Sequence, residues 1–262
     1  MEDLKVAYLQ QDIVWNDKLK NFENIENILS STTEHFDLLV LPEVFATGFG
    51  NDILEMAEPI YSDTYMFMSR IAQKYSAVVV GSCFCSSDDG CYNRLYWVFP
   101  NGQNGYYDKR HLFRIGSEYK MLQKGTTNQV FEIKGWKVAP FICYDLRFPV
   151  WMRNSFNDTF AYDLALVVAS WPARRANVWK QLLVARAIEN MSYVVGVNRI
   201  GKDIDGVEFV GDSRVVDFKG TIIDEIEQNK EQLNIVTLSH DNMSAFRTKM
   251  PFYLDWDNFD IK

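Results

Sequence analysis

Short apolar runs of strand length alternate with stretches of helical period along the whole chain. Strands are predicted over residues 6–9, 36–41, 77–83, 94–99, 138–143, 163–169, 193–198, 214–217 and 221–226, and helices over 18–30, 64–75 and 177–190. This alternation is typical of a layered α/β domain, in which sheets bury their apolar faces beneath helices or against a second sheet. We therefore expect an α/β fold.

The chain has the length and composition of one large domain. It contains 262 residues, of which 47% are hydrophobic and 15% aromatic, so it can bury a large core and is not a disordered chain. A Ser/Gly/Pro-rich linker, a charge run or a low-complexity tract would mark a boundary, and the sequence has none of these. We predict a single domain over residues 1–262 with an aromatic tail from about 250 to 262.

Charge and hydropathy exclude two classes of partner. The 27 Lys and Arg residues face 35 Asp and Glu residues, the net charge is -8, and no basic stripe exists, so nucleic acid is not an expected partner. The longest apolar runs, such as 38–41 and 164–169, fall far short of the roughly 20 residues of a membrane-spanning helix. The first residues lack the pattern of a secretory signal, and we expect a cytoplasmic protein with free thiols.

The sequence contains partial matches to several known motifs, but each lacks a residue that the motif requires. Cys83, Cys85 and Cys91 have neither a paired CxxC spacing nor nearby histidines, so zinc is not expected and packing explains them. Residues 196–203 nearly match a phosphate-binding loop, but Asp203 occupies the position that requires Ser or Thr. The segment after Gly211 lacks the closing glycine of a serine nucleophile turn. We predict no metal and no cofactor.

Three ionisable residues each stand at the end of an apolar strand. The segments are Leu38-Leu-Val-Leu-Pro-Glu43, Gly105-Tyr-Tyr-Asp-Lys109 and Ala139-Pro-Phe-Ile-Cys143. Strand ends are where open α/β architectures place their active-site groups. A thiol needs a base or a positive field to become an effective nucleophile at neutral pH, and a glutamate and a lysine supply these.

These three segments closely resemble the glutamate, lysine and cysteine motifs of the nitrilase superfamily, the carbon-nitrogen hydrolases. The residues at 171–172, 185–190, 198–199 and 211–214 resemble further blocks of that family in the right order, and the bacterial ω-amidase branch is the most similar. The resemblance implies a four-layer αββα sandwich of the nitrilase type, usually a homodimer. It also implies hydrolysis of a non-peptide amide through a cysteine thioester, with a small amide and water as reactants.

The resemblance also implies roles for individual residues. Cys143 is the nucleophile, Glu43 the general base, and Lys109 stabilises the oxyanion together with the backbone N–H of Tyr144. Glu118, in a looser match, is the second glutamate that holds the lysine and the substrate. The nearby Lys109 would lower the pKa of Glu43 while desolvation would raise it, and the sequence leaves the outcome open.

A small dicarboxylic monoamide such as 2-oxoglutaramate or succinamate needs a cation for its carboxylate. Arg147 and Arg174 are the substrate-binding candidates, and Arg175 follows directly. For Arg147, a salt bridge to Asp145 or to another nearby acid is at least as good an interpretation.

Aromatic residues beside the motifs can wall the site or belong to the core. We favour Tyr144 and Trp171 as pocket residues because each adjoins a motif at a strand end. Phe45 and Phe113 have both interpretations open.

Other functions are compatible with the same residues. An N-carbamoyl amino acid amidohydrolase or a nitrilase would use the same Glu-Lys-Cys triad, and a catalytically silent dimeric scaffold would keep only the fold. A cysteine-histidine hydrolase would require His111 within hydrogen-bond reach of Cys143. The aromatic tail is predicted to reach the dimer interface.

Overall fold

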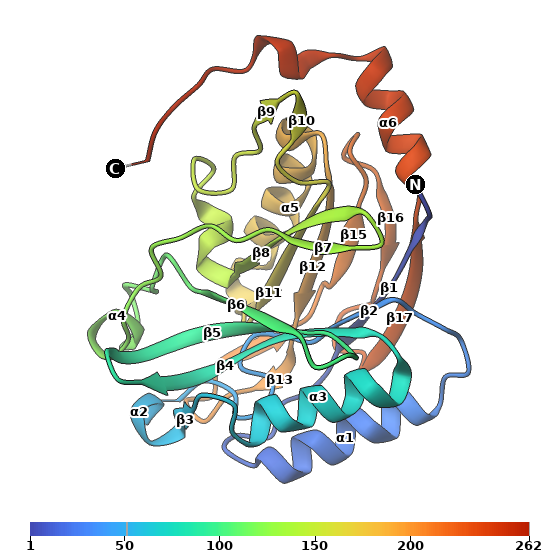
Figure 1. Ribbon diagram of the computed structural model, residues 1–262. Coiled ribbons are helices and arrows are strands. Elements are labelled where there is room, and N and C mark those ends of the chain that lie inside the picture. Colours follow the sequence, from blue (N-terminus) through green and yellow to red (C-terminus); the bar gives the residue numbers. More distant parts are fainter. Residues whose placement is uncertain (51, 262) are drawn as a thin grey trace.

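The computed structural model describes residues 1–50 and 52–261. Two sheets form the centre of the molecule (Figure 1). The first has the strand order β17-β1-β2-β4-β5-β6 with β3 beside β4, and the second has the order β16-β15-β12-β11-β8-β7.

The first sheet consists of β1 (Leu4–Gln10), β2 (Leu38–Val40), β3 (Glu58–Pro59), β4 (Val78–Ser87), β5 (Gly90–Val98), β6 (Asn104–Asp108) and β17 (Gln232–Leu238). The second consists of β7 (Phe131–Ile133), β8 (Trp136–Ile142), β11 (Leu164–Ala169), β12 (Tyr193–Asn198), β15 (Arg214–Val216) and β16 (Ile222–Glu225). Two short ladders pair β9 (Phe156–Asn157) with β10 (Thr159–Phe160), and β13 (Ile200–Lys202) with β14 (Glu208–Val210).

Helices cover the outer face of each sheet and complete the predicted αββα sandwich. In Figure 1, α1 (Lys18–Ser30) and α3 (Asp63–Tyr75) lie below the first sheet, and α5 (Ala176–Asn190) lies against the second. The remaining helices are α2 (Ile53–Met56), α4 (Glu118–Met121) and α6 (His240–Lys249). None of the described helices is both long enough and apolar enough to cross a membrane.

The alternation of side chains along β1 explains why two cores form. Leu4, Val6 and Tyr8 point into the core between the two sheets, whereas Ala7 and Leu9 point into the core beneath α1 and α3. Successive side chains of a strand face opposite sides, so a strand that is apolar at four consecutive positions, residues 6–9, serves both layers.

The outer helices follow the pattern predicted from the sequence. Helix α1 begins where the side chain of Asp17 accepts the backbone N–H of Lys20 at 3.0 Å, a helix N-cap. Its buried residues Phe22, Ile25 and Leu29 recur three and four positions apart and face the first sheet.

Several parts of the chain differ from the sequence prediction, and the short elements β3, β7, β9, β10, β13, β14, α2 and α4 had no predicted counterpart. The strand expected to end at residue 83 continues to Ser87, so β4 and β5 form a hairpin that turns at residues 88–89. Strand β17 and helix α6 were not predicted; β17 is the edge strand that pairs with β1. The side chains of β17 are mostly half-buried, which weakens the hydrophobic signal of the segment.

The topology brings four strand ends to one region. Strand β2 is parallel to β4, β5 is antiparallel to β4, and β6 is antiparallel to β5, so β2 and β6 run in the same direction. In the facing sheet, β8 and β11 are parallel neighbours. The segments that follow β2, β6, β8 and β11 carry Glu43, Lys109, Cys143 and Ser170.

Candidate active site

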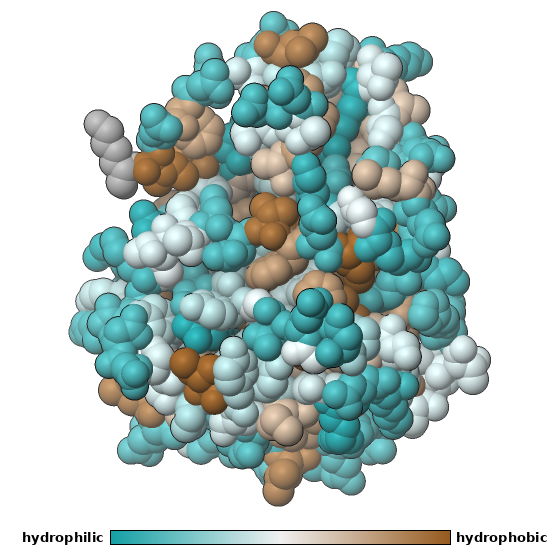
Figure 2. Space-filling model, in the orientation of Figure 1, coloured by the Kyte–Doolittle hydropathy of each residue, from teal (hydrophilic) through white to brown (hydrophobic). Residues whose placement is uncertain are grey.

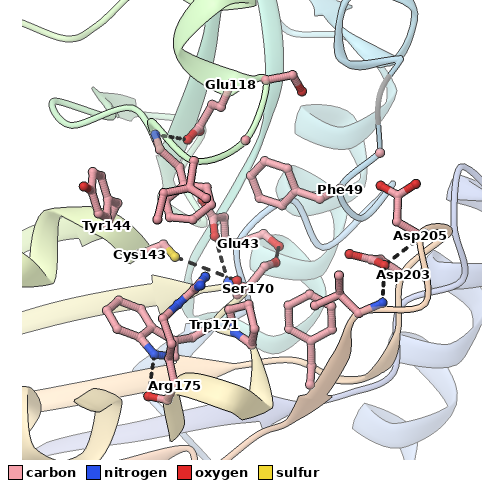
Figure 3. A pocket seen from close by; sticks show the side chains of 18 of the residues that line it. Glu43, Phe49, Glu118, Cys143, Tyr144, Ser170, Trp171, Arg175, Asp203 and Asp205 are labelled. Carbon is pink, nitrogen blue, oxygen red and sulfur yellow. Dashed lines mark hydrogen bonds between the residues drawn. The ribbon is translucent and has the colours of Figure 1, made fainter.

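A cavity of about 240 Å³ lies where these four segments meet (Figure 3). All eight residues predicted for the site line this cavity: Glu43, Lys109, Glu118, Cys143, Tyr144, Arg147, Trp171 and Arg174. The structure therefore brings together residues that are far apart in the sequence, as the convergence of strand ends requires.

Glu43 is fully buried directly after β2. The next residue, Val44, has a φ of 45°, which is a strained conformation for a β-branched residue. The backbone N–H of Val44 donates to the hydroxyl of Ser82 on β4 at 2.9 Å. This bond ties the turn to the neighbouring strand and fixes the direction in which the Glu43 side chain leaves the backbone.

Lys109 joins two buried carboxylates. Its Nζ lies 2.8 Å from Oε1 of Glu43, and 2.9 and 3.0 Å from the two carboxylate oxygens of Glu118. The side chains of the lysine and both glutamates are at most 2% exposed. Glu118 is held in addition by the backbone N–H of Phe113, which donates to its Oε2 at 2.7 Å.

Asn93, which was not predicted from the sequence, completes this group. Its Nδ2 donates to Oε1 of Glu43 at 2.8 Å and to Oε1 of Glu118 at 3.2 Å. Its backbone carbonyl accepts the N–H of Lys109 at 3.0 Å, so β5 places the amide beside the lysine. An amide within a strand that is mostly apolar and aromatic apart from Arg94 was the available signal, because buried polar groups require partners.

Cys143 follows β8 at a sharp turn. It has a φ of 44°, and a 3-10 helix, η1 (Cys143–Arg147), begins with it. Its Sγ lies 3.9 Å from the carbonyl oxygen of Ser170, at the end of β11. The backbone N–H of the same Ser170 donates to Oε2 of Glu43 at 2.7 Å. In Figure 3, the sulfur points toward Ser170 and Glu43.

Burial and neighbouring charges shift the pKa values of the three central groups. Burial raises the pKa of Glu43; the charge of Lys109 opposes this effect and the charge of Glu118 adds to it. Of the two opposing effects that the sequence indicates, desolvation is the larger. Burial also raises the pKa of the Cys143 thiol well above its usual range, and the negative charge of Glu43 raises it further. Burial alone would lower the pKa of Lys109, but the charges of Glu118 and Glu43 outweigh it and raise that pKa.

The side chain of Asp145 connects the cysteine turn with the lysine segment. Its Oδ1 accepts the backbone N–H of His111 at 2.9 Å and faces the ring Nδ1 at 2.8 Å. Its Oδ2 accepts the hydroxyl of Tyr107 at 2.7 Å and the N–H of Ile142 at 3.0 Å. Among the described residues, His111 makes no hydrogen bond to Cys143, so the structure does not assemble the cysteine-histidine pair.

The arginines near the cavity are not paired with acids. The suggested bridge between Arg147 and Asp145 is wrong, because the guanidinium of Arg147 instead lies over the ring of Trp171 at 5.0 Å. Arg175, which also lines the cavity, lies over Phe113 at 5.1 Å. Within residues 1–50 and 52–261, none of Arg147, Arg174 and Arg175 forms an ion pair. Burial lowers the pKa of Arg175, and the charges of Arg174 and Arg147 lower it further.

The aromatic walls agree only partly with the sequence prediction. Tyr144 and Phe113 line the cavity and meet edge to face at 5.3 Å, and Trp171 lies beneath them. Phe45 does not line it: this ring is fully buried under α1 and α3, because the turn after Glu43 points it away. Phe49 takes the wall position opposite Tyr144 (Figure 3).

Two further cavity residues were not predicted as binding residues. Asp203 and Asp205 stand on the loop between β13 and β14, at the rim shown on the right of Figure 3. Oδ1 of Asp203 accepts the N–H groups of Asp205 and Val207 at 3.0 and 2.8 Å, which shapes the loop. The near match to a phosphate-binding loop was the only sequence signal here, and it indicated another chemistry.

The other cysteines lie outside the cavity. Cys83 and Cys85 are buried beneath α3, and Cys85 contacts the hydroxyl of Tyr96 at 3.3 Å. Cys91 packs at the edge of a small cluster around Phe84. All four cysteines are free thiols.

The chain that carries this site is similar to known proteins over most or all of its length. The family model for carbon-nitrogen hydrolases matches residues 5–248. Omega-amidase YafV of Escherichia coli K12 is 40% identical over 261 residues, which cover 100% of both chains. The 2-oxoglutaramate amidase of Bacillus subtilis is 33% identical over 223 residues, which cover 84% of this chain and 85% of that protein.

A solved structure has nearly the same backbone. A CN-hydrolase superfamily protein from Xanthomonas campestris, crystallised with an arsenic adduct in its active site, superposes with a TM-score of 0.97 at 39% identity and covers 100% of both chains.

Proposed function

The chain belongs to the carbon-nitrogen hydrolase family, and we propose that Glu43, Lys109 and Cys143 carry out in it the hydrolysis of a small dicarboxylic monoamide. The chain is an amidase with ω-amidase-like activity on a linear amide. The proposed substrates are 2-oxoglutaramate and succinamate, and the products are the dicarboxylate and ammonia. The observation that carries the proposal is the position of Ser170, which bonds both the thiol and the carboxylate.

The first half of the reaction forms a thioester. The thiol proton passes to Oε2 of Glu43 as Sγ of Cys143 attacks the amide carbon. The oxygen of the tetrahedral intermediate faces a Nζ–H of Lys109 and the backbone N–H of Tyr144. Glu43 then gives its proton to the amide nitrogen, the C–N bond breaks, and ammonia leaves.

The second half uses the same groups on water. Glu43 removes a proton from water, whose oxygen attacks the thioester carbon. The C–S bond breaks, the proton returns from Glu43 to the sulfur, and the carboxylate product forms. A base whose pKa is raised by burial suits both steps, because it accepts and returns a proton near neutral pH.

The hydrogen bonds that Lys109 already makes limit how it can stabilise the oxyanion. An ammonium has three N–H donors, and three carboxylate oxygens lie within 3.0 Å of Nζ. One N–H must therefore be shared between the two oxygens of Glu118 when the third turns toward the oxyanion. Glu118 is thus proposed to orient the lysine.

We propose that the substrate carboxylate binds among Arg147, Arg174 and Arg175. Unpaired guanidinium groups in a partly closed cavity recognise a carboxylate through charge-assisted hydrogen bonds. Tyr144 and Trp171 are proposed to shield the thioester from bulk water.

The test is ammonia release from four compounds: 2-oxoglutaramate, succinamate, an N-carbamoyl amino acid and a simple nitrile. We expect turnover of the first two that disappears in Cys143→Ala and persists in Cys91→Ala, a matched cysteine outside the cavity. Turnover of only the carbamoyl compound or the nitrile would keep the triad and replace the substrate. No turnover of any compound would favour a silent scaffold.

We further propose a homodimer that uses the C-terminal tail. Tyr253 packs on Phe156 at 4.4 Å, and Trp256 lies edge-on to Phe160 at 5.9 Å. Leu254 and Phe259 point outward with 67% and 47% of their surface exposed. Apolar side chains also lie beside the end of the tail in Figure 2. Exposed apolar residues on a segment held in place are typical of an interface.

We also propose a cytoplasmic location, because the mechanism needs Cys143 as a reduced thiol and a reducing compartment maintains it. Cell fractionation with an antibody would test this proposal.

A further inference from the structure

Asn93 determines which oxygen of Glu43 is free to receive a proton. Oε1 of Glu43 accepts two hydrogen bonds, from Lys109 at 2.8 Å and from Asn93 at 2.8 Å. A carboxylate oxygen has about two acceptor positions, so both are occupied. Within residues 1–50 and 52–261, Oε2 accepts one hydrogen bond, from the backbone N–H of Ser170 at 2.7 Å, which leaves its second acceptor position open. The carbonyl of the same Ser170 lies 3.9 Å from the thiol of Cys143.

The orientation of the Asn93 amide follows from charge. Its nitrogen faces one oxygen of Glu43 and one of Glu118, and both are acceptors. The flipped amide would place its own oxygen against two carboxylates, an arrangement without donors. In the orientation present, Oδ1 of Asn93 has no hydrogen-bond partner among the described residues.

Asn93 does not touch the substrate cavity. Its side chain is fully buried and is absent from the cavity lining, while Glu43, Lys109 and Glu118 line it. Any influence of the Asn93 side chain on the reaction must therefore pass through the carboxylates that it bonds.

We propose that Asn93 is a positioning residue, whose amide occupies Oε1 of Glu43 and clamps Glu43 to Glu118, so that Oε2 is the only oxygen that exchanges protons with Cys143. This inference rests on the proposed role of Glu43 as base. Without the clamp, the carboxylate of Glu43 can rotate about its last bond and lose its alignment with the sulfur. Loss of a donor to the charged form also makes that form less favourable.

The experiment measures the reactivity of Cys143 without any amide substrate. Iodoacetamide alkylates the thiolate, and mass spectrometry of the Cys143 peptide follows the reaction from pH 4 to 10. In Asn93→Leu we expect alkylation at neutral pH to slow roughly ten-fold and its acid limb to move upward by about one pH unit. Because this readout needs no substrate, it remains informative if the proposed amide is wrong.

Two further variants control for size and stability. Asn93→Asp keeps the side-chain size but sets a third carboxyl group against Glu43 and Glu118, and its alkylation should be no faster than that of Asn93→Leu. Asn154→Leu removes another buried amide, bonded to Asn190 and Tyr162, and should lower the Tm while the alkylation profile stays unchanged.

Three results would overturn the proposal. These are an unchanged profile in Asn93→Leu, a wild-type rate in Asn93→Asp, and an equal shift in Asn154→Leu. If Asn93→Leu does not fold, Asn93→Ser takes its place, because a hydroxyl is too short to bridge both carboxylates.

Discussion

His111 presents both its backbone N–H and its ring Nδ1 to the same carboxylate oxygen of Asp145, at 2.9 and 2.8 Å. The ring also stacks on Phe148 at 3.8 Å. These contacts lock the segment after Lys109 onto the turn that begins with Cys143. The histidine thus links two motifs, and the proposed mechanism gives it no proton to transfer.

His111→Ala should therefore weaken the fold more than the chemistry. Loss of one hydrogen bond to a buried carboxylate costs about 1–3 kcal/mol, and the Tm should fall by several degrees. We expect kcat to fall less than ten-fold. His240→Ala, on α6, is the matched control and should leave kcat unchanged. A loss of about 100-fold or more in His111→Ala, as expected of a general base, would contradict this assignment.

The pKa of Glu43 predicts the acid limb of activity. The base must be ionised, so activity falls as the pH falls through the pKa, which burial raises above the ordinary glutamate value of 4.5. We expect the acid limb of kcat/KM to lie above pH 4.5. Glu43→Gln should lose about 10²–10⁴-fold in rate at every pH. An acid limb at or below pH 4.5 in the wild type would argue against a buried glutamate base.

From the raised pKa of Lys109 we predict that the folded protein loses stability at high pH. Its pKa is raised in the folded protein by Glu118 and Glu43. Its stabilising contribution is therefore complete below the unfolded value of about 10.5 and is lost as the pH rises through the folded value. Thermal denaturation from pH 8 to 11 should show a Tm that declines above pH 10. In Lys109→Met, which leaves two carboxylates without a cation, the free energy of unfolding at pH 8 should be about 3–5 kcal/mol lower.

The three cavity arginines should affect charged and neutral substrates differently. Replacing the arginine that binds the carboxylate by Leu removes about 1.5–3 kcal/mol, or roughly 10- to 150-fold in kcat/KM for succinamate. The rate on butyramide, which has no carboxylate, should not change. The variants are Arg147→Leu, Arg174→Leu and Arg175→Leu, with Arg70→Leu on α3 as a distant control. Equal losses on both substrates would indicate a structural effect.

A double variant in the C-terminal tail tests whether the tail contributes to dimer formation separately from its contribution to folding. The double variant Leu254→Ser and Phe259→Ser keeps the packing of Tyr253 and Trp256 but removes outward apolar surface. Light scattering should show a wild-type dimer that dissociates in the double variant with little change in Tm. A dimer of unchanged affinity would place the interface elsewhere.

Local patterns predicted a layered α/β domain, and the resemblance to the carbon-nitrogen hydrolases implied the four layers and the residues of the site. Periodicity located α1, α3 and α5, and the motifs located Glu43, Lys109 and Cys143 at strand ends that converge. What remained hidden depends on the three-dimensional environment. Whether Phe45 or Phe49 faces the cavity depends on the turn after Glu43.

The pKa shift of Glu43 and the role of Asn93 also depend on the three-dimensional environment. The direction of the Glu43 pKa shift depends on burial and on two charges from other segments. The role proposed for Asn93 requires knowing that two carboxylates, 50 and 25 residues away in sequence, share its amide nitrogen.

The bonds of Ser170 to the thiol and to the carboxylate come from its main chain, not from its hydroxyl. Every amino acid except proline carries the same N–H and C=O pair. The alignment of Cys143 with Glu43 therefore does not require a particular side chain at position 170. Sequence variation at this position would hide the importance of its main chain. Ser170→Pro alone among substitutions would delete the N–H. Ser170→Ala would keep the N–H and lose only the hydroxyl bond to the backbone carbonyl of Glu43 at 3.4 Å.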